Sequence, residues 1–293
     1  KGLVSFAGVA VNLVYAILLF GKEAAFSFPL MGSGFDFSLR LYHFSSFIVL
    51  ASAGFSFLIV LYSLVFMIGK SNLKQYYLFL LITVAMVNGA TLANNLFLML
   101  FFWEGLLITT FVLIMAGGKK SFHTAVKALI LVGVSDLCMT LGIIIAGQIG
   151  GTFEMDKIHL PLNHMGSVAF ILLMTGAIAK AGSMPFHSWI PDAALDAPSP
   201  FMAFLPAALE KLLGIYFLAR ICLDLFQFNP GSSMSLLLMI IGAVTIFLAV
   251  MMALIQTDYK KLLSYHAISQ VGYMILGIGT ALPVGIVGGL FHM

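Results

Sequence analysis

The stretch "GAIAKAGSMPFHSWIPDA", residues 176–193, decides how the fold is read from the sequence. It follows the apolar run "SVAFILLMT", which is typical of a membrane-spanning helix. Lys180, Gly182, Pro185 and His187 then come where hydrocarbon would be expected. Proline removes a backbone donor, and non-helical backbone at membrane depth is tolerated only inside protein or beside water. The stretch therefore predicts either a helix that ends in a surface loop or a helix that is broken within the membrane.

The composition indicates a protein whose solvent is mostly lipid. Of 293 residues, 61% are apolar and 9% are charged, and the mean hydropathy is +1.11. Soluble domains carry about 25% charged residues, and a soluble surface this apolar would aggregate. The net charge of +3 is spread along the chain, so no basic block predicts a nucleic-acid partner.

The apolar runs predict an all-α polytopic membrane protein. A helix needs about 20 apolar residues to cross roughly 30 Å of hydrocarbon. Strands of a membrane barrel would instead alternate in segments of about ten residues, a pattern that the apolar runs do not follow. A tenth run begins near residue 283, so we expect about nine or ten transmembrane helices. The first nine runs are 2–20, 44–68, 76–94, 97–116, 124–147, 166–184, 200–222, 233–255 and 262–280.

The connections between these runs give further expectations. Residues 21–43 are rich in Phe and Leu and are expected to lie along the membrane interface. The chain begins with Lys and stops soon after the tenth run starts, so we expect a fragment of a longer protein. If the runs alternate in direction, one side has the larger share of the lysines and is the better candidate for the cytoplasmic side. Its residues are Lys70, Lys74, Lys119, Lys120, Lys260 and Lys261.

Several apolar runs contain ionisable residues far from their ends. Each charge near the bilayer centre costs at least a few kcal/mol. A single Glu–Lys pair can serve only to fix the register of two helices, and that interpretation stays open for each residue taken alone. A set on several helices, with both signs present, favours a hydrated path of titratable groups. The residues concerned are Glu104, Asp136, Lys180, Glu210, Lys211 and His266, with Gln270 one turn after His266.

Lysine is well suited to such a path. Desolvation favours the neutral amine, whereas a nearby carboxylate favours the charged form. A lysine balanced between these effects can take up and release a proton near neutral pH. Glu104 would set that balance for Lys180 if their helices touch.

Four stretches resemble one family. "WEGLLITTFVLI", "GAIAKAGSMPFHSWIPDA", "LEKLLGIYFLAR" and "QTDYKKLLSYHAISQVGYMILGIG" are similar to the proton-translocating antiporter-like subunits. These subunits occur in respiratory complex I, in Mrp-type sodium/proton antiporters, and in membrane-bound energy-converting hydrogenases and formate hydrogenlyases. The resemblance covers roughly residues 44–293.

The resemblance implies a fold with inverted repeats. The family has about fourteen helices and two inverted repeats of five, each containing a broken helix. We therefore expect residues 1–293 to form a single transmembrane domain. The first repeat would span about residues 76–222, the start of the second would span residues 233–293, and the discontinuous helix would lie near 180–190.

The resemblance also implies site residues. Glu104 falls on the family's fifth-helix glutamate, Lys180 on the lysine of its broken helix, and His292 on the first histidine of its eleventh helix. Lys211 lies one residue before the usual bridging lysine, and Leu212 occupies that place, so Glu210 gains interest. The predicted proton-transfer residues are Glu104, Asp136, Lys180, Glu210, Lys211, His266 and His292.

The implied function is proton translocation by a membrane subunit of a redox-driven pump, of the energy-converting hydrogenase or complex I type. Such a subunit is non-catalytic within an oxidoreductase complex and has no cofactor of its own. Its expected partners are other membrane subunits, peripheral redox subunits carrying Fe–S clusters, and the lipid of a prokaryotic cytoplasmic membrane. The alternatives are a sodium/proton antiporter subunit, a non-conducting membrane anchor, and a proton-linked subunit for inorganic-carbon uptake.

Overall fold

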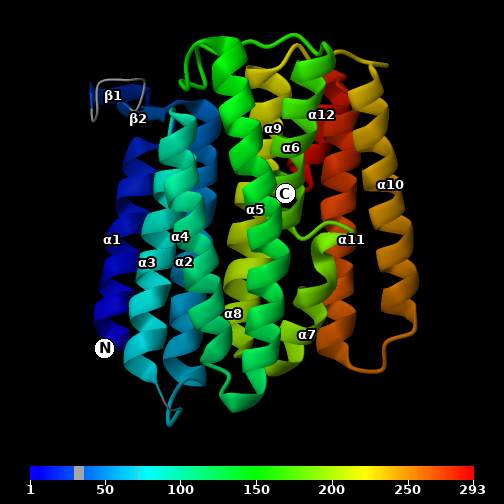
Figure 1. Cartoon of the computed structure of the whole chain (residues 1–293). Helices are drawn as coiled ribbons and strands as arrows, with labels where there is room; N and C mark the ends of the chain where they lie inside the picture. Colours follow the sequence, from blue (N-terminus) through cyan, green and yellow to red (C-terminus); the bar gives the residue numbers. More distant parts are fainter. Residues whose placement is uncertain (30–35, 71) are drawn as a thin grey trace. The chain divides into compact units, whose positions relative to one another are not determined.

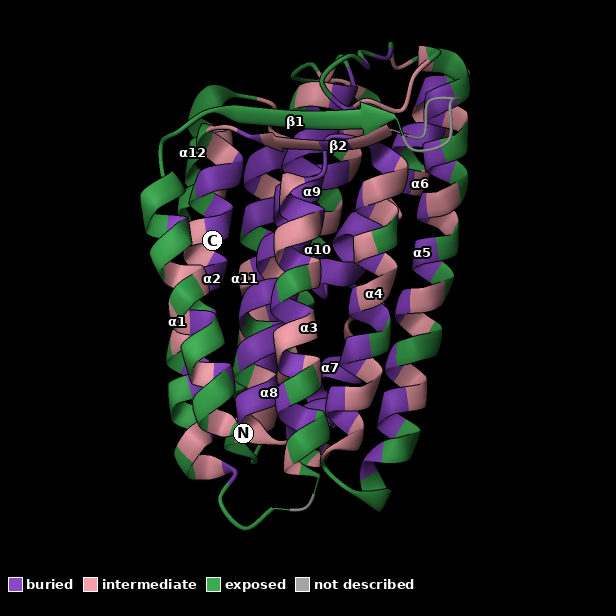
Figure 2. Ribbon diagram, turned by 90° about the vertical axis from the view of Figure 1, so that its left-hand side faces the viewer, coloured by how far each residue is buried: buried purple, intermediate pink, exposed green. Residues whose placement is uncertain are grey.

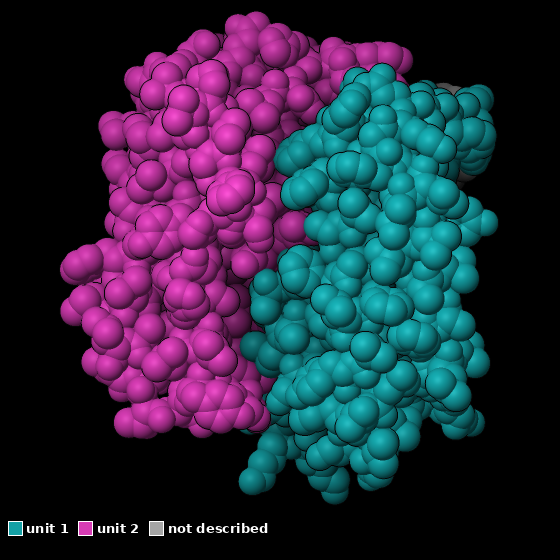
Figure 3. Space-filling model, turned by 180° about the vertical axis from the view of Figure 1, so that it is seen from behind, with its two compact units in different colours: residues 1–129, 196–209 teal, residues 130–195, 210–293 magenta. Residues whose placement is uncertain are grey.

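The computed structural model describes residues 1–29, 36–70 and 72–293. They form two compact units, coloured separately in Figure 3. Unit 1 comprises Lys1–Leu129 and Asp196–Leu209, and unit 2 comprises Ile130–Leu195 and Glu210–Met293. These divisions differ from those of the predicted repeats, and the repeat boundaries stay a prediction.

Unit 1 is built on four long helices. They are α1 (Gly2–Leu19), α2 (His43–Phe66), α3 (Leu73–Leu92) and α4 (Leu96–Met115), and the unit also contains the short α8 (Ser199–Phe204). Helix α1 contacts α2 and α3, α3 packs along α4, and α2 contacts α8 (Figure 1).

Buried hydroxyls within α2 are satisfied by the helix itself. Ser52 donates to the carbonyl of Val49, and Ser56 donates to the carbonyl of Ser52. Since the backbone supplies these partners, serine costs little inside an apolar bundle.

A β-hairpin interrupts the helical pattern in unit 1. Strand β1 (Ala24–Pro29) pairs antiparallel with β2 (Asp36–Leu41). Figure 2 shows β1 exposed along its length. The amide of Asn94 donates to the carbonyl of Ser38 at 2.8 Å, which ties β2 to the turn between α3 and α4. From the sequence we expected an interfacial connection here and did not predict the strands.

Unit 2 contains the helices around the quoted stretch. They are the part of α5 (Phe122–Gly150) from residue 130 onward, α6 (His164–Ala181), α7 (Trp189–Asp196) up to residue 195, α9 (Glu210–Arg220), α10 (Ser233–Leu254), α11 (Tyr259–Gly279) and α12 (Pro283–Phe291). Helix α6 packs along α9, and α11 packs against α9, α10 and α12 (Figure 1).

Short irregular turns adjoin several helices of both units. Two are 3₁₀ turns, η1 (Lys119–Ser121) and η2 (Phe186–Ser188), and two are π-helical turns, η3 (Leu205–Leu209) and η4 (Ile221–Leu225). The turns η3 and η4 flank α9, so the segment from 199 to 225 is helical but not a regular α-helix throughout.

The quoted stretch forms a broken helix. Gly182 has φ +84° and ends α6 in the left-handed conformation. Its amide donates to the carbonyl of Ala179, and the amide of Ser183 donates to the carbonyl of Ile178, which is the Schellman arrangement for a helix C-terminus. The helix resumes through η2 into α7, within one apolar span from His164 to Asp196. Of the two interpretations left open by the sequence, the broken helix is confirmed.

Eight helical spans in the described residues are long and apolar enough to cross a membrane. They correspond to the first eight predicted runs. The ninth run forms α11 (Tyr259–Gly279), whose polar residues, among them His266 and Gln270, place it outside that set. The tenth run forms the short α12.

Candidate functional site

A buried ion pair lies next to the helix break in unit 2. The Nζ atom of Lys180 donates to Oδ2 of Asp136 at 3.4 Å. The Lys180 side chain is 0% exposed and that of Asp136 is 1% exposed. The structure therefore places a carboxylate beside the lysine that the sequence singled out.

The residue spacing of α5 explains why Asp136 points inward. Buried residues recur along α5 at intervals of four and three, which places them on one face of a helix. Asp136 is the polar member of this stripe, so it faces the packed side rather than lipid. The stripe consists of Val132, Asp136, Met139, Ile143 and Ala146.

Glycines allow α5 and α6 to approach closely in unit 2. A Cβ added at Gly142 of α5 would lie 2.9 Å from the backbone nitrogen of Leu173. A Cβ added at Gly176 of α6 would lie 2.6 Å from Cβ of Met139. Because larger side chains are absent at both points, the short Asp136 side chain reaches the lysine on the neighbouring helix.

The pair suits proton exchange. A buried ion pair requires good geometry and further polar partners to offset its desolvation. Transfer of the lysine proton to the carboxylate would leave two neutral groups, which the apolar surroundings tolerate. The pair can therefore adopt two protonation arrangements without leaving a lone buried charge.

Glu210 and Lys211 begin α9, the helix that packs along α6. Glu210 is 2% exposed, whereas Lys211 is half-buried and Leu212 is buried. Both ionisable residues thus lie on a helix adjacent to the one that carries Lys180. Their part in a proton path stays a prediction.

His292 is connected to α11. Its Nε2 atom hydrogen-bonds Oε1 of Gln270, and its ring lies 5.2 Å from that of Tyr273. His266 lies one turn before Gln270 and is exposed. The hydrogen bond therefore links the polar face of α11 to His292, while proton transfer through His266 and His292 stays a prediction.

Glu104 lies on α4 in unit 1 and is half-buried. Lys180 belongs to unit 2, and the pairing of these two residues stays a prediction. From the sequence, Asp136 was named as a proton-transfer residue but not as the partner of Lys180. The regular spacing of apolar residues around Asp136 was the signal that placed it on the buried face of α5.

Arg220 is a further buried charge in unit 2. The apolar runs place it at a membrane boundary, but the residue is 1% exposed. Its Nε donates to Oδ2 of Asp224 at 2.8 Å, and Nη1 donates to the hydroxyl of Tyr216 at 3.5 Å. These contacts lie within α9 and η4, one turn apart, so they stabilise the irregular end of that helix.

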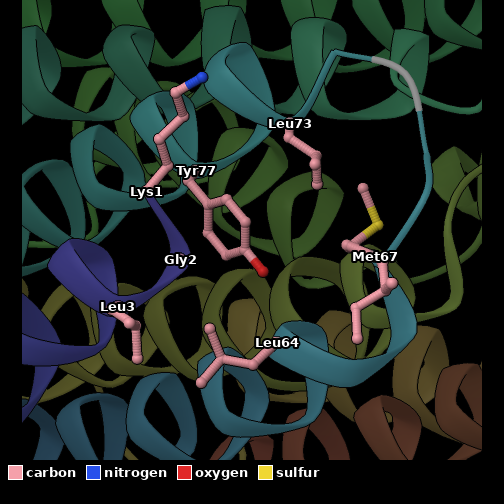
Figure 4. A pocket seen from close by; sticks show the side chains of 8 residues that line it. Lys1, Gly2, Leu3, Leu64, Met67, Leu73 and Tyr77 are labelled. Atoms are coloured by element: carbon pink, nitrogen blue, oxygen red, sulfur yellow. The ribbon is translucent and has the colours of Figure 1, made fainter.

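A cleft at one end of unit 1 is separate from these residues. It has a volume of about 300 Å³ and is lined by Lys1, Gly2, Leu3, Leu64, Met67, Ile68, Leu73 and Tyr77 (Figure 4). None of the seven predicted proton-transfer residues lines it. Within residues 1–29, 36–70 and 72–293, no group of three or more His, Cys, Asp or Glu side chains is placed to hold a metal ion.

The transmembrane model of the NADH:quinone oxidoreductase/Mrp antiporter family matches residues 93–293. The chain belongs to this family. The matched region contains the helices that carry the predicted residues described above. They are α4 with Glu104, α5 with Asp136, α6 with Lys180, and α9 with Glu210 and Lys211. The family and the apolar spans together identify an integral membrane protein.

Curated relatives include both kinds of protein in the family's name, the NADH-quinone oxidoreductases and the antiporters. Subunit L of the NADH-quinone oxidoreductase of Pseudomonas aeruginosa is 31% identical over 274 residues, which is 90% of this chain and 43% of the relative. A Na(+)/H(+) antiporter component of Alkalihalophilus pseudofirmus is 31% identical over 233 residues, which is 76% of this chain and 47% of the relative. The chain thus spans less than half the length of these two relatives.

Solved structures share the fold. The archaeal membrane-bound sulfane sulfur reductase, a respiratory membrane complex, matches with a TM-score of 0.89 at 23% identity, over 99% of this chain and 62% of that chain. The Mrp complex of Dietzia sp. matches with a TM-score of 0.87 at 21% identity, over 99% of this chain and 56% of that chain. The chain therefore has the fold of antiporter-like membrane subunits.

Proposed function

We propose that the chain is a proton-translocating membrane subunit of a redox-driven ion pump, of the energy-converting hydrogenase or complex I type. One observation carries this proposal: a fully buried ion pair, Asp136–Lys180, lies where a membrane helix is broken. Membership of the family, with an NADH-quinone oxidoreductase subunit among the relatives, supports it. The chain would work in a prokaryotic cytoplasmic membrane, together with other membrane subunits and with peripheral redox subunits that carry Fe–S clusters.

In this proposal the protonation of Lys180 changes during turnover. Electron transfer in the partner subunits changes the electrostatics around Glu104 and Lys180 and weakens the hold of Asp136 on the lysine. A weakened ion pair favours the neutral amine, because the lysine is desolvated. The proton then moves to the ionisable residues of the neighbouring helix, Glu210 and Lys211, and onward to His266 and His292.

Removal of the lysine tests the proposal. In the complete complex reconstituted into vesicles, Lys180→Ala and Lys180→Met should abolish proton translocation while the complex still assembles. The matched control is Lys157→Ala, which removes an exposed lysine paired with Glu154 in the same unit. Translocation at the native rate in both Lys180 variants would refute the proposal.

A sodium/proton antiporter subunit is the second candidate function. It is favoured by the Na(+)/H(+) antiporter relative, which is as similar to the chain as the oxidoreductase relative is. The two functions differ in their ion dependence. A pH gradient that forms in vesicles with sodium but not with potassium, in the absence of electron transfer, would establish the antiporter function instead.

A non-conducting anchor is the remaining alternative. The Asp136–Lys180 pair would then serve only to hold α5 against α6. Full coupling of electron transfer to proton movement in a Glu104→Ala, Lys180→Ala variant would establish this role and refute proton conduction.

A further inference from the structure

A pair of buried hydroxyl groups connects the helix break to a third helix. The Oγ atom of Ser183 lies 3.0 Å from Oγ1 of Thr245 on α10. Both residues are 0% exposed. The two hydroxyl groups therefore satisfy each other inside the protein, where water does not compete for their hydrogen bond.

Ser183 is firmly joined to the helical turn that carries Lys180. The amide of Ser183 donates to the carbonyl of Ile178, and the amide of Gly182 donates to the carbonyl of Ala179. These two bonds close the last turn of α6 around the lysine. A displacement of Ser183 therefore displaces the backbone from which Lys180 extends.

Thr245 lies on the narrow buried face of α10. The buried residues of that helix are Ser235, Leu238, Gly242, Thr245 and Ala249, spaced by three and four residues. Gly242 permits close packing on α11, because a Cβ there would lie 2.6 Å from the backbone nitrogen of Leu276. One turn after Gly242, Thr245 presents the hydroxyl that meets Ser183.

We propose that Ser183 and Thr245 are positioning residues, which tie the broken end of α6 to α10 and so hold Lys180 at working distance from Asp136. The inference rests on the proposed function, because its consequence is proton transfer by Lys180. Three helices would then define the ion pair: α5 supplies the carboxylate, α6 supplies the amine, and α10 fixes the break. A shift of α10 along its own axis would then displace Lys180 through the Ser183–Thr245 hydrogen bond.

The test removes the hydroxyl of Thr245 without changing the shape of its side chain. In the complete complex reconstituted into vesicles, Thr245→Val should lower the number of protons translocated per electron transferred by up to about fivefold, because one lost hydrogen bond changes the equilibrium that positions the lysine by about that factor. Thr245→Ser retains the hydroxyl and should restore the native ratio. Ser183→Ala removes the same bond and also the weaker one from Oγ of Ser183 to the carbonyl of Met184 at 3.3 Å, so it should lower the ratio at least as much as Thr245→Val, and the double variant should be no worse than Ser183→Ala alone.

The control is Ser235→Ala on the same helix. Ser235 is equally buried and donates to the carbonyl of Gly279 at 2.6 Å. This variant should lower thermal stability but leave the ratio of protons to electrons unchanged. A purely structural role of Thr245 would instead make Thr245→Val behave like Ser235→Ala, and that result would overturn the inference.

Lys180→Met, measured in parallel, separates the positioning role from the proposed function. If it abolishes translocation while Thr245→Val keeps the native ratio, the positioning role is wrong and the proposed function stands. If Lys180→Met itself keeps the native ratio, the proposed function is wrong. A loss that Thr245→Ser fails to restore would assign the effect to packing of the methyl group, which also overturns the positioning role.

Discussion

Removal of one or both partners of the buried ion pair separates its contribution to stability from its contribution to transport. The variants are Asp136→Leu, Lys180→Met and the two combined. Each single variant leaves one ionisable group in a site where both side chains are at most 1% exposed. The double variant replaces both groups with apolar side chains, so that no buried charge is left.

The magnitude follows from the geometry. Two unit charges 3.4 Å apart attract by about 5 kcal/mol at an effective dielectric constant of about 20. Desolvation of both groups offsets much of that attraction, which is why replacing a whole buried pair is often neutral. Removing one partner leaves an uncompensated charge and costs about 3–5 kcal/mol. We expect this loss in each single variant and a free energy of unfolding within about 1–2 kcal/mol of native in the double variant.

The assay combines two measurements on the same protein. Reversible unfolding in mixed detergent micelles gives the free energy of unfolding, and acidification of vesicles gives proton translocation. The double variant should be nearly as stable as the native protein and should translocate no protons. If it pumps at the native rate, the pair has a structural role and takes no part in transport. If it loses as much stability as the two single variants summed, desolvation does not offset the attraction within the pair.

Two further predictions concern glycines. Gly214→Val should lower the free energy of unfolding by about 2 kcal/mol or more through overpacking, because a Cβ there would lie 2.6 Å from the backbone nitrogen of Ala181 and 2.7 Å from the carbonyl oxygen of Ala177. The mid-helix control is Gly54→Ala on α2, where a Cβ meets nothing within 4 Å. This variant should leave the free energy of unfolding unchanged or raise it by up to about 1 kcal/mol. Equal losses of stability at both positions in thermal unfolding would contradict overpacking as the cause. Gly182→Ala should lower the free energy of unfolding by at least about 1 kcal/mol, since φ is +84° and the new Cβ would lie 2.4 Å from Cδ1 of Ile190. If denaturant titration shows native stability for this variant, the left-handed helix cap does not require glycine.

The apolar runs predicted the long helices closely because their length is set by the membrane. The run 97–116 corresponds to α4 (Leu96–Met115), and the run 233–255 corresponds to α10 (Ser233–Leu254). The hairpin was missed although its signal was present. The residues "FSF" at 26–28 and "FSLRL" at 37–41 alternate apolar and polar side chains with the period of a strand.

The ion pair was only half predictable. Spacing along α5 places Asp136 on a buried face, but spacing within one helix does not identify the helix that packs against that face. The neighbour is determined by glycines on both helices, at Gly142 and Gly176, whose effect appears only when the chain is folded. The burial of Arg220 was not predicted for a similar reason. The sequence shows this residue near the end of an apolar run, while its burial depends on the ion pair with Asp224 one turn later.

The helix end at Ala181 has an electrostatic consequence of its own. Backbone dipoles of α6 sum to about half a negative charge at its C-terminus, and Lys180 lies in that last turn. The ammonium group therefore experiences the negative potential of the helix end as well as that of Asp136. The carboxylate of Asp136 can be protonated, whereas the peptide carbonyls cannot. A break placed one residue after the lysine thus supplies a permanent field, which stays in place whatever the protonation state of the carboxylate.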